Sequence, residues 1–160
     1  MTAFDRAWNV VKMPIVPHSL KETKNKYPFA YYSALFDDTK TGERLPMEAV
    51  FEEGTGTRWD NHLDHLRAMI LEGKDTDPRS QATFARAEGL KEKDPFFTPS
   101  DVETDYEHQG KGYATALYDM AASILNRRDE KLPLVPSDMQ SAEAQFLWRN
   151  RDEWPVRDDL

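Results

Sequence analysis

The chain has 160 residues, no cysteine and a formal net charge of −8. The lack of cysteine excludes a disulfide framework, a thiolate zinc site and a cysteine nucleophile, and the negative charge argues against nucleic acid as a partner. No stretch approaches the ~20 apolar residues that cross a bilayer, and the first residues do not resemble a signal peptide. We therefore expect a cytoplasmic protein with no membrane partner. The length predicts one domain over residues 1–160.

The first third of the chain predicts an arm followed by a hairpin. Residues 1–27 combine prolines with a short apolar piece and the polar run KETKNK, which we interpret as an N-terminal arm ending in a solvated connector. The segment Phe29–Glu53 has aromatic residues in its first half, turn residues in DDTKTGE, and Val50 and Phe51 near its end. This pattern predicts a β-hairpin with a loop longer than two residues.

The middle of the chain predicts two helices. Apolar residues recur at helical spacing before Gly73, which predicts a helix over residues 58–72, and a second, weaker helix is predicted over residues 79–90. The helical spacing over residues 58–72 comes from Trp59, Leu63, Leu66, Met69 and Ile70.

In the predicted first helix, His62 and His65 would lie one turn apart. Two histidines without a third ligand are usually surface residues, so we expect no metal.

The last third predicts strands alternating with helices. The sequence FFTPSDVET predicts the central strand over residues 98–105, in which Pro99 indicates a bulge, an edge position or a later strand start. A helix then carries a stripe of alanine and leucine, a short strand is predicted over residues 132–135, and the final helix has Ser137 or Asp138 as its N-cap. This order predicts a mixed α/β domain. We interpret the acidic tail DEWPVRDDL as a mobile end, with docking through Trp154 as the alternative.

The sequence QGKGYAT, at residues 109–115, stands between a predicted strand and a predicted helix. Glycines let the backbone approach an anion closely, and a helix N-terminus supplies unpaired N–H groups and a partial positive charge. The Walker A spacing is absent, and Thr115 replaces the third glycine of the Rossmann pattern. The segment therefore predicts an anion site suited to a pyrophosphate.

These residues resemble motif A of the GNAT superfamily of N-acetyltransferases, whose pattern Q/R-x-x-G-x-G/A matches Gln109–Ala114. Downstream, SAEAQFLW at Ser141–Trp148 is similar to the family's N-x-x-A-x-x-L-Y. The resemblance covers residues 96–151, which would form the coenzyme A-binding core. The segment LVPSDMQSAEAQFLW also resembles GNAT-like segments of large bacteriophage proteins, which would place the chain in a host cytoplasm.

The resemblance implies a GNAT-like mixed sheet, mostly antiparallel, flanked by helices and containing a splayed parallel strand pair. It implies acetyl-CoA as the cosubstrate, with pyrophosphate at the helix start and pantetheine along the central strand. Ser141 stands where the family often has an asparagine that binds the pantetheine arm. The implied binding residues are Val102, Thr104, Gln109, Gly110, Lys111, Gly112, Tyr113, Ala114, Thr115 and Ser141.

The catalytic groups that the resemblance implies differ from those usual in the family. The attacking amine must lose a proton, for which Asp101 and Glu103 are the candidate bases, acting through water. Trp148 occupies the position of the family's tyrosine acid, although an indole N–H donates hydrogen bonds and is not a usable acid. The alternatives close to the motif are Tyr106, His108 and Tyr118.

The expected function is transfer of an acetyl group from acetyl-CoA to an amine. The acceptor would be a small cationic molecule, or a lysine or N-terminus of a protein, in keeping with the acidic surface. An alternative is a non-catalytic or degenerate GNAT-fold interaction protein. Trp148 favours this alternative, and so does Thr98, which stands where some family members carry a glutamate base.

Overall fold

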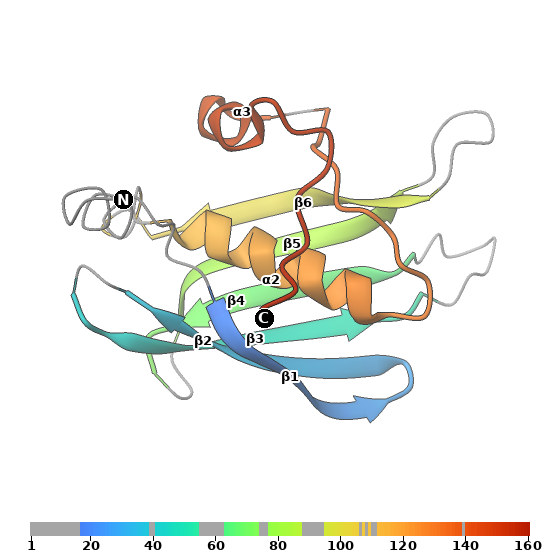
Figure 1. The fold of residues 1–160 in the computed structure, drawn as a ribbon, viewed down its shortest axis with the longest axis horizontal. Helices are drawn as coiled ribbons and strands as arrows, with labels where there is room; N and C mark the ends of the chain where they lie inside the picture. Colours follow the sequence, from blue (N-terminus) through green and yellow to red (C-terminus); the bar gives the residue numbers. More distant parts are fainter. Residues whose placement is uncertain are drawn as a thin grey trace, which may run out of the picture.

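The computed structural model describes residues 17–38, 41–54, 63–73, 77–87, 95–105, 107, 109, 112–138 and 140–160. These residues form six strands and two α-helices (Figure 1). In chain order the elements are β1 (Pro17–Lys26), β2 (Phe29–Asp37), β3 (Arg44–Glu52), β4 (His65–Leu71), β5 (Pro78–Ala87), β6 (Phe96–Thr104), α2 (Tyr113–Arg127) and α3 (Ala142–Trp148).

The strands form one antiparallel sheet in which each strand pairs with the next along the chain, from β1 to β6. Side chains alternate between the two faces of a strand, and the burial pattern follows this period of two. In β4, for example, Leu66, Ala68 and Ile70 are fully buried, whereas Arg67 between them is exposed. The alternation gives the sheet one apolar face.

Helix α2 lies across that apolar face (Figure 1) and closes the core. Its side chains Leu117, Met120 and Ile124 are completely buried, and burial of each contributes about 1.5–3 kcal/mol. Aromatic contacts join the helix to the sheet: the ring centroids of Phe36 and Tyr113 lie 4.8 Å apart in an edge-on arrangement. These contacts fix the start of α2 relative to the strands.

The C-terminal segment packs back onto α2. The Trp154 amide donates to the Leu134 carbonyl over 2.8 Å, and its indole donates to Asp119 of α2, also over 2.8 Å. Arg127, in the last turn of α2, donates to the carbonyl oxygen of Leu160 over 2.6 Å. The interpretation of the acidic tail as a mobile end is therefore wrong, and the alternative, docking through Trp154, is correct.

The predicted fold class, a mixed α/β sheet with a splayed parallel strand pair and helices on both faces, is wrong. The sheet is antiparallel throughout, and the parallel pairing in the described part of the chain is one bridge between Phe97 and Leu134. The strand predicted over residues 132–135 is reduced to that bridge. Helix α2 covers one face of the sheet, and α3 lies beyond its β6 edge (Figure 1).

Both helices predicted in the middle of the chain are wrong where the structure describes them. Residues from the first form β4 and residues from the second form β5; residues 55–62 and 88–94 lie outside the described part. Apolar residues in HLRAMIL fit a period of two as well as a helical period. Pairing with β3 and β5 on its two sides selects the extended form.

Most of the remaining predictions of helices and strands are confirmed. The predicted hairpin is confirmed as β2 and β3, and the predicted strand over residues 98–105 is confirmed as β6, although it lies at the sheet edge and not at its centre. The run KETKNK belongs to β1, so it is not a connector. The final helix is confirmed as α3, but its N-cap is Ser141 rather than Ser137 or Asp138.

Candidate functional site

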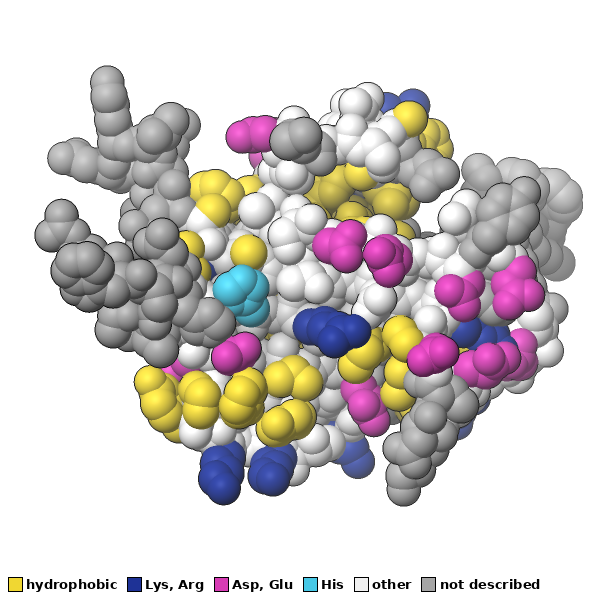
Figure 2. Space-filling model, turned by 180° about the vertical axis from the view of Figure 1, so that it is seen from behind, with side chains coloured by type: hydrophobic (Ala, Val, Ile, Leu, Met, Phe, Trp, Pro, Cys, Tyr) yellow, Lys and Arg dark blue, Asp and Glu magenta, His cyan; other side chains and the backbone are white. Residues whose placement is uncertain are grey.

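A groove of about 1260 Å³ runs between β6 and α3 and reaches the N-terminus of α2. Figure 2 views the molecule from behind and shows hydrophobic side chains between the upper lobe, which contains α3, and acidic side chains on the sheet below. The walls come from segments that adjoin one another in the sequence. The C-terminal half of β6 forms one wall, the start of α2 forms the end, and residues 137–148 form the opposite wall.

The β6 wall is the edge of the sheet. At Phe97 the outer edge of β6 is paired: its N–H donates to the Pro133 carbonyl over 2.9 Å, and its carbonyl accepts from Val135 over 2.8 Å. Beyond this point the two segments diverge, and residues 99–104 of β6 line the groove. The register with β5 shifts between the partners of Pro99 and Asp101, which marks a bulge. Beyond the bulge, residues 101–104 lie at the edge of the sheet, where backbone N–H and C=O groups can pair with an extended ligand.

The α2 end of the groove is a helix N-terminus capped by glycine. Gly112 has φ of 79°, in the left-handed region that glycine tolerates best. The first intrahelical bond runs from the Ala116 N–H to the Gly112 carbonyl over 3.1 Å. The N–H groups of residues 114 and 115 precede that bond, and the first turn contains no acidic residue. These groups and the helix dipole favour an anion at this end.

Side-chain contacts hold the end of β6 near the start of α2. The Gln109 amide donates to the Thr104 carbonyl over 3.3 Å, and the Thr104 hydroxyl lies 2.8 Å from that of Ser80. On the neighbouring side, Arg79 is buried and donates to the Tyr113 hydroxyl over 3.2 Å. The strand edge and the helix start are thus fixed relative to each other before a ligand binds.

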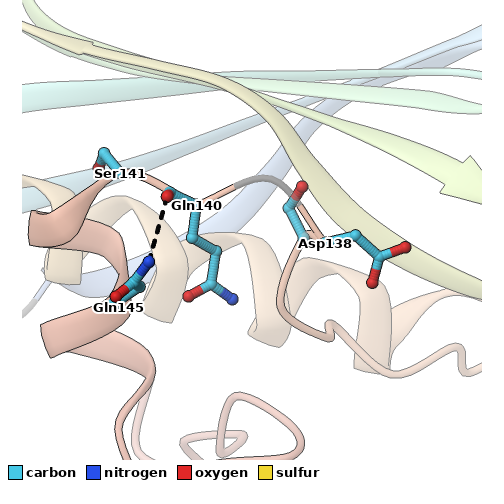
Figure 3. Close-up of a pocket in the computed structure, with 5 residues that line it drawn as sticks. Asp138, Gln140, Ser141 and Gln145 are labelled. Atoms are coloured by element: carbon cyan, nitrogen blue, oxygen red, sulfur yellow. Dashed lines mark hydrogen bonds between the residues drawn. The ribbon is translucent and has the colours of Figure 1, made fainter.

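The α3 wall is polar at its start and apolar further along. The Ser141 hydroxyl accepts from the Ala144 N–H over 3.1 Å and caps the helix. Figure 3 shows a smaller hollow at this start, where Gln145 donates to the Gln140 carbonyl over 3.5 Å. Further along, Phe146 lines the groove with 71% of its surface exposed. Its ring gives this wall an apolar part beside the polar start.

An aromatic cluster borders the groove beside α2 and α3. Tyr118 lines the groove although only 2% of it is exposed, and its ring centroid lies 5.6 Å from that of Trp148 and 4.9 Å from that of Trp154. Burial raises the pKa of the Tyr118 phenol, and a hydrogen bond with Trp148 offsets part of this rise. The phenol therefore stays protonated at neutral pH.

The charge on the groove is uneven. The charged residues among the described lining are Asp101, Glu103 and Asp105, all on or next to β6. Glu103 accepts from the Gln81 amide over 3.1 Å, which orients one carboxylate. The β6 wall therefore attracts a cationic group, whereas the helix start attracts an anionic one.

The structure brings most of the sequence-predicted site residues together in this groove. Gly110 and Lys111 lie outside the described residues, as do Tyr106 and His108. The sequence interpretation missed Phe146 and Gln140 as lining residues. The predicted residues that line the groove are Asp101, Val102, Glu103, Thr104, Gln109, Gly112, Tyr113, Ala114, Thr115, Ser141 and Trp148.

The described residues offer neither a metal site nor a membrane-spanning helix. Within the described part of the chain, no group of three or more histidine, aspartate or glutamate residues is arranged to hold a metal ion; His65 lies in β4, and His62 lies outside that part. Neither described helix combines the length and the apolar character needed to span a bilayer.

Comparisons with known proteins do not identify a relative. Searches of protein-family models, curated proteins and solved structures find no match to this chain.

Proposed function

We propose that the groove binds acetyl-CoA and that the protein transfers the acetyl group to an amine. The observation that carries the proposal is the junction of an exposed strand edge with a glycine-capped helix N-terminus in one groove. Coenzyme A needs both features, because its pyrophosphate is joined to an amide-containing arm that can bind in an extended form. The groove volume also exceeds the range of about 300–1,000 Å³ that suits compact ligands.

Two parts of the cosubstrate match features of the groove. The N–H groups of residues 114 and 115 suit the pyrophosphate. The edge of β6 from Val102 to Thr104 suits the pantetheine amides, which would pair with it as a further strand does. The thioester then lies toward the aromatic end, at Tyr118 and Trp148. The resemblance of Gln109–Ala114 and Ser141–Trp148 to two acetyltransferase motifs supports the choice of coenzyme A among nucleotide-containing ligands.

The acceptor in this proposal is a cationic amine, either a small molecule or a protein lysine or N-terminus. Asp101 and Glu103 supply negative charge on the wall opposite the aromatic cluster. They hold the acceptor's charge and take up the proton of the attacking amine through water. Placing the amine against the thioester supplies a large share of the rate, because a thioester is already activated.

The test is isothermal titration of coenzyme A into the wild-type protein and two variants, Gly112→Asn and Gly112→Asp. Asparagine and aspartate have the same shape and both tolerate positive φ, so the pair isolates one negative charge at the helix start. We expect the dissociation constant of the aspartate variant to exceed that of the asparagine variant about tenfold or more, since about 1.4 kcal/mol corresponds to tenfold. Folded wild-type protein that gives no binding at millimolar coenzyme A would refute the proposal.

A second function is favoured by one observation. Trp148 occupies the aromatic end of the groove, and its indole cannot act as an acid. This favours a protein that binds coenzyme A or a related ligand without chemistry. Thioester consumption in the presence of acetyl-CoA and a panel of polyamines and lysine peptides separates the two functions, because the non-catalytic protein binds coenzyme A and consumes no thioester.

A further inference from the structure

One face of the sheet carries no helix in the described part of the chain. Helix α2 covers the opposite face, and α3 lies beyond the β6 edge (Figure 1). Paired residues of antiparallel strands point their side chains to the same side of a sheet, so the strand register identifies the residues that share this open face. On β1, β2 and β3 these residues form three neighbouring rows, which consist of lysines, aromatic residues and acids.

Aromatic rings form the middle row, on β2. Ala30 and Tyr32 are buried in the core, so Phe29 and Tyr31, at the alternate positions, point to the open face. Their ring centroids lie 6.3 Å apart. Tyr31 has 36% of its surface exposed, and Tyr27, in the turn before β2, has 73% exposed. Exposed rings of this kind can stack against planar groups of a ligand.

Lysines form the row beside these rings, on the edge strand β1, and all of them are exposed. Figure 2 looks onto this face and shows Lys or Arg side chains below a row of hydrophobic ones. The expectation against nucleic acid rests on the net charge of −8, which is a sum over the chain, whereas this edge attracts anions locally. The pairs are Lys26 with Phe29, Lys24 with Tyr31 and Lys21 with Ser33.

Acidic side chains form the row on the other side of the rings, on β3. Glu52 pairs with Phe29, and Glu48 pairs with Ser33. Neighbouring strands lie about 4.8 Å apart, so the face changes from cationic on β1 to anionic on β3 within about 10 Å. A broad anionic surface such as a lipid bilayer would meet the acids as well as the lysines. A single strand of nucleic acid avoids this conflict, because its phosphates can lie along one side and its unpaired bases along the other.

We propose that this face binds single-stranded nucleic acid, with phosphates on the lysines of β1 and bases stacked on Phe29 and Tyr31. The inference goes beyond the acyl transfer proposed for the groove and does not depend on it. Lysine contacts to phosphate carry no sequence information, and an aromatic ring stacks on any base. The binding is therefore independent of sequence and sensitive to salt.

The test is fluorescence anisotropy of a labelled strand of about 12 nucleotides, as RNA and as DNA, with the wild-type protein and without coenzyme A. We expect a dissociation constant of about 10⁻⁴ to 10⁻⁶ M, as is usual for sequence-independent binding. Log affinity against log salt should have a slope of about −2, because each phosphate neutralised by one of the three lysines adds about −0.7 for a single strand. A duplex of the same sequence, whose bases stack on one another, should bind more weakly.

Two variants separate stacking from charge. Tyr31→Leu removes the ring and keeps an apolar side chain, so affinity should fall about tenfold with the salt slope unchanged. Lys24→Gln should weaken binding and reduce the slope by about 0.7. The matched control is Lys131→Gln, which makes the same change of charge in the connection after α2 and should alter neither quantity.

Several outcomes would overturn the inference. They are the absence of binding to either strand at low salt and about 10⁻³ M protein, equal effects of Lys24→Gln and Lys131→Gln, and equal binding of the duplex. Binding to vesicles that contain phosphatidylserine, without binding to either strand, would overturn it in favour of a membrane. Binding of either strand with the expected slope supports it, and the tighter of the two identifies the sugar. Because Lys24 is exposed, its variant decides the matter even if Tyr31→Leu does not fold.

Discussion

The contact between Asp119 and Trp154 places a carboxyl group where water hardly reaches it. Asp119 lies in α2 with 5% of its surface exposed and accepts the Trp154 indole N–H over 2.8 Å. Burial raises the pKa of this carboxyl, and the hydrogen bond from Trp154 together with the charges of Arg157 and Arg151 opposes the rise only in part. The contact therefore joins the C-terminal segment to α2 at a cost that depends on pH.

The sign of that dependence predicts the effect of Asp119→Asn. Between the ordinary pKa of the unfolded chain and the raised pKa of the folded one, the native state binds more protons, so stability falls as pH rises through this window. Asparagine keeps an oxygen for the Trp154 indole and does not titrate. We expect its stability relative to the wild type to increase as pH rises above the ordinary pKa of an aspartate, as measured by urea unfolding at several pH values.

Asp159→Asn is the matched control, because the hydrogen bond from Arg157 lowers the pKa of the Asp159 carboxyl. A lowered folded-state pKa makes stability rise with pH through the window below the ordinary value. Asparagine at residue 159 should therefore lose stability relative to the wild type as pH rises, the opposite trend. If the stability difference between Asp119→Asn and the wild type is the same at every pH, the assignment of the raised pKa to Asp119 is wrong.

Among the elements, the sequence predicts α2 and the first hairpin well because their signals are unambiguous. Residues 113–127 follow a glycine and carry a helical stripe that includes Leu117 and Leu125. In contrast, HLRAMIL and RSQATFARA combine good helix formers with a spacing that also fits a strand. Their state depends on neighbouring strands, which a local pattern cannot supply.

The candidate site was more predictable than the fold because it is built from neighbouring segments. Its walls are β6, the start of α2 and α3, which follow one another in the chain, so residues chosen from local motifs come together. The antiparallel pairing of the described strands does not change this proximity. The position of Tyr118 was not predictable to the same degree, since it depends on which face of α2 turns toward Trp148 and Trp154.

Helix α3 is short, so its N-cap should govern how well it forms a groove wall. Ser141→Ala removes the acceptor of the Ala144 N–H, and the loss of an N-cap costs about 1 kcal/mol. We expect faster amide hydrogen exchange over residues 142–148 and weaker binding of coenzyme A, with exchange in α2 unchanged. Ser141→Thr retains a capping oxygen and should behave nearly as the wild type does. Exchange that is equally fast in both variants would show that the cap does not hold α3.

At the scale of the whole molecule, the proposed cosubstrate and the protein repel each other at long range. The chain carries a formal charge of −8, and the described charged residues of the groove are acidic. Coenzyme A carries several phosphate charges of the same sign. Binding in this proposal depends on short-range contacts at the start of α2, which act only after the ligand has approached against the repulsion.

This repulsion predicts an unusual salt dependence. The screening length falls from about 30 Å at 0.01 M salt to about 8 Å at 0.15 M, so the association rate of coenzyme A should rise several-fold over this range in stopped-flow measurements. Coenzyme A without its 3′-phosphate carries less charge and should show a smaller rise. A cationic acceptor such as spermidine should show the reverse trend, because the same acidic surface attracts it. Association of coenzyme A that slows as salt is added would instead mean that cationic groups control the approach to the groove.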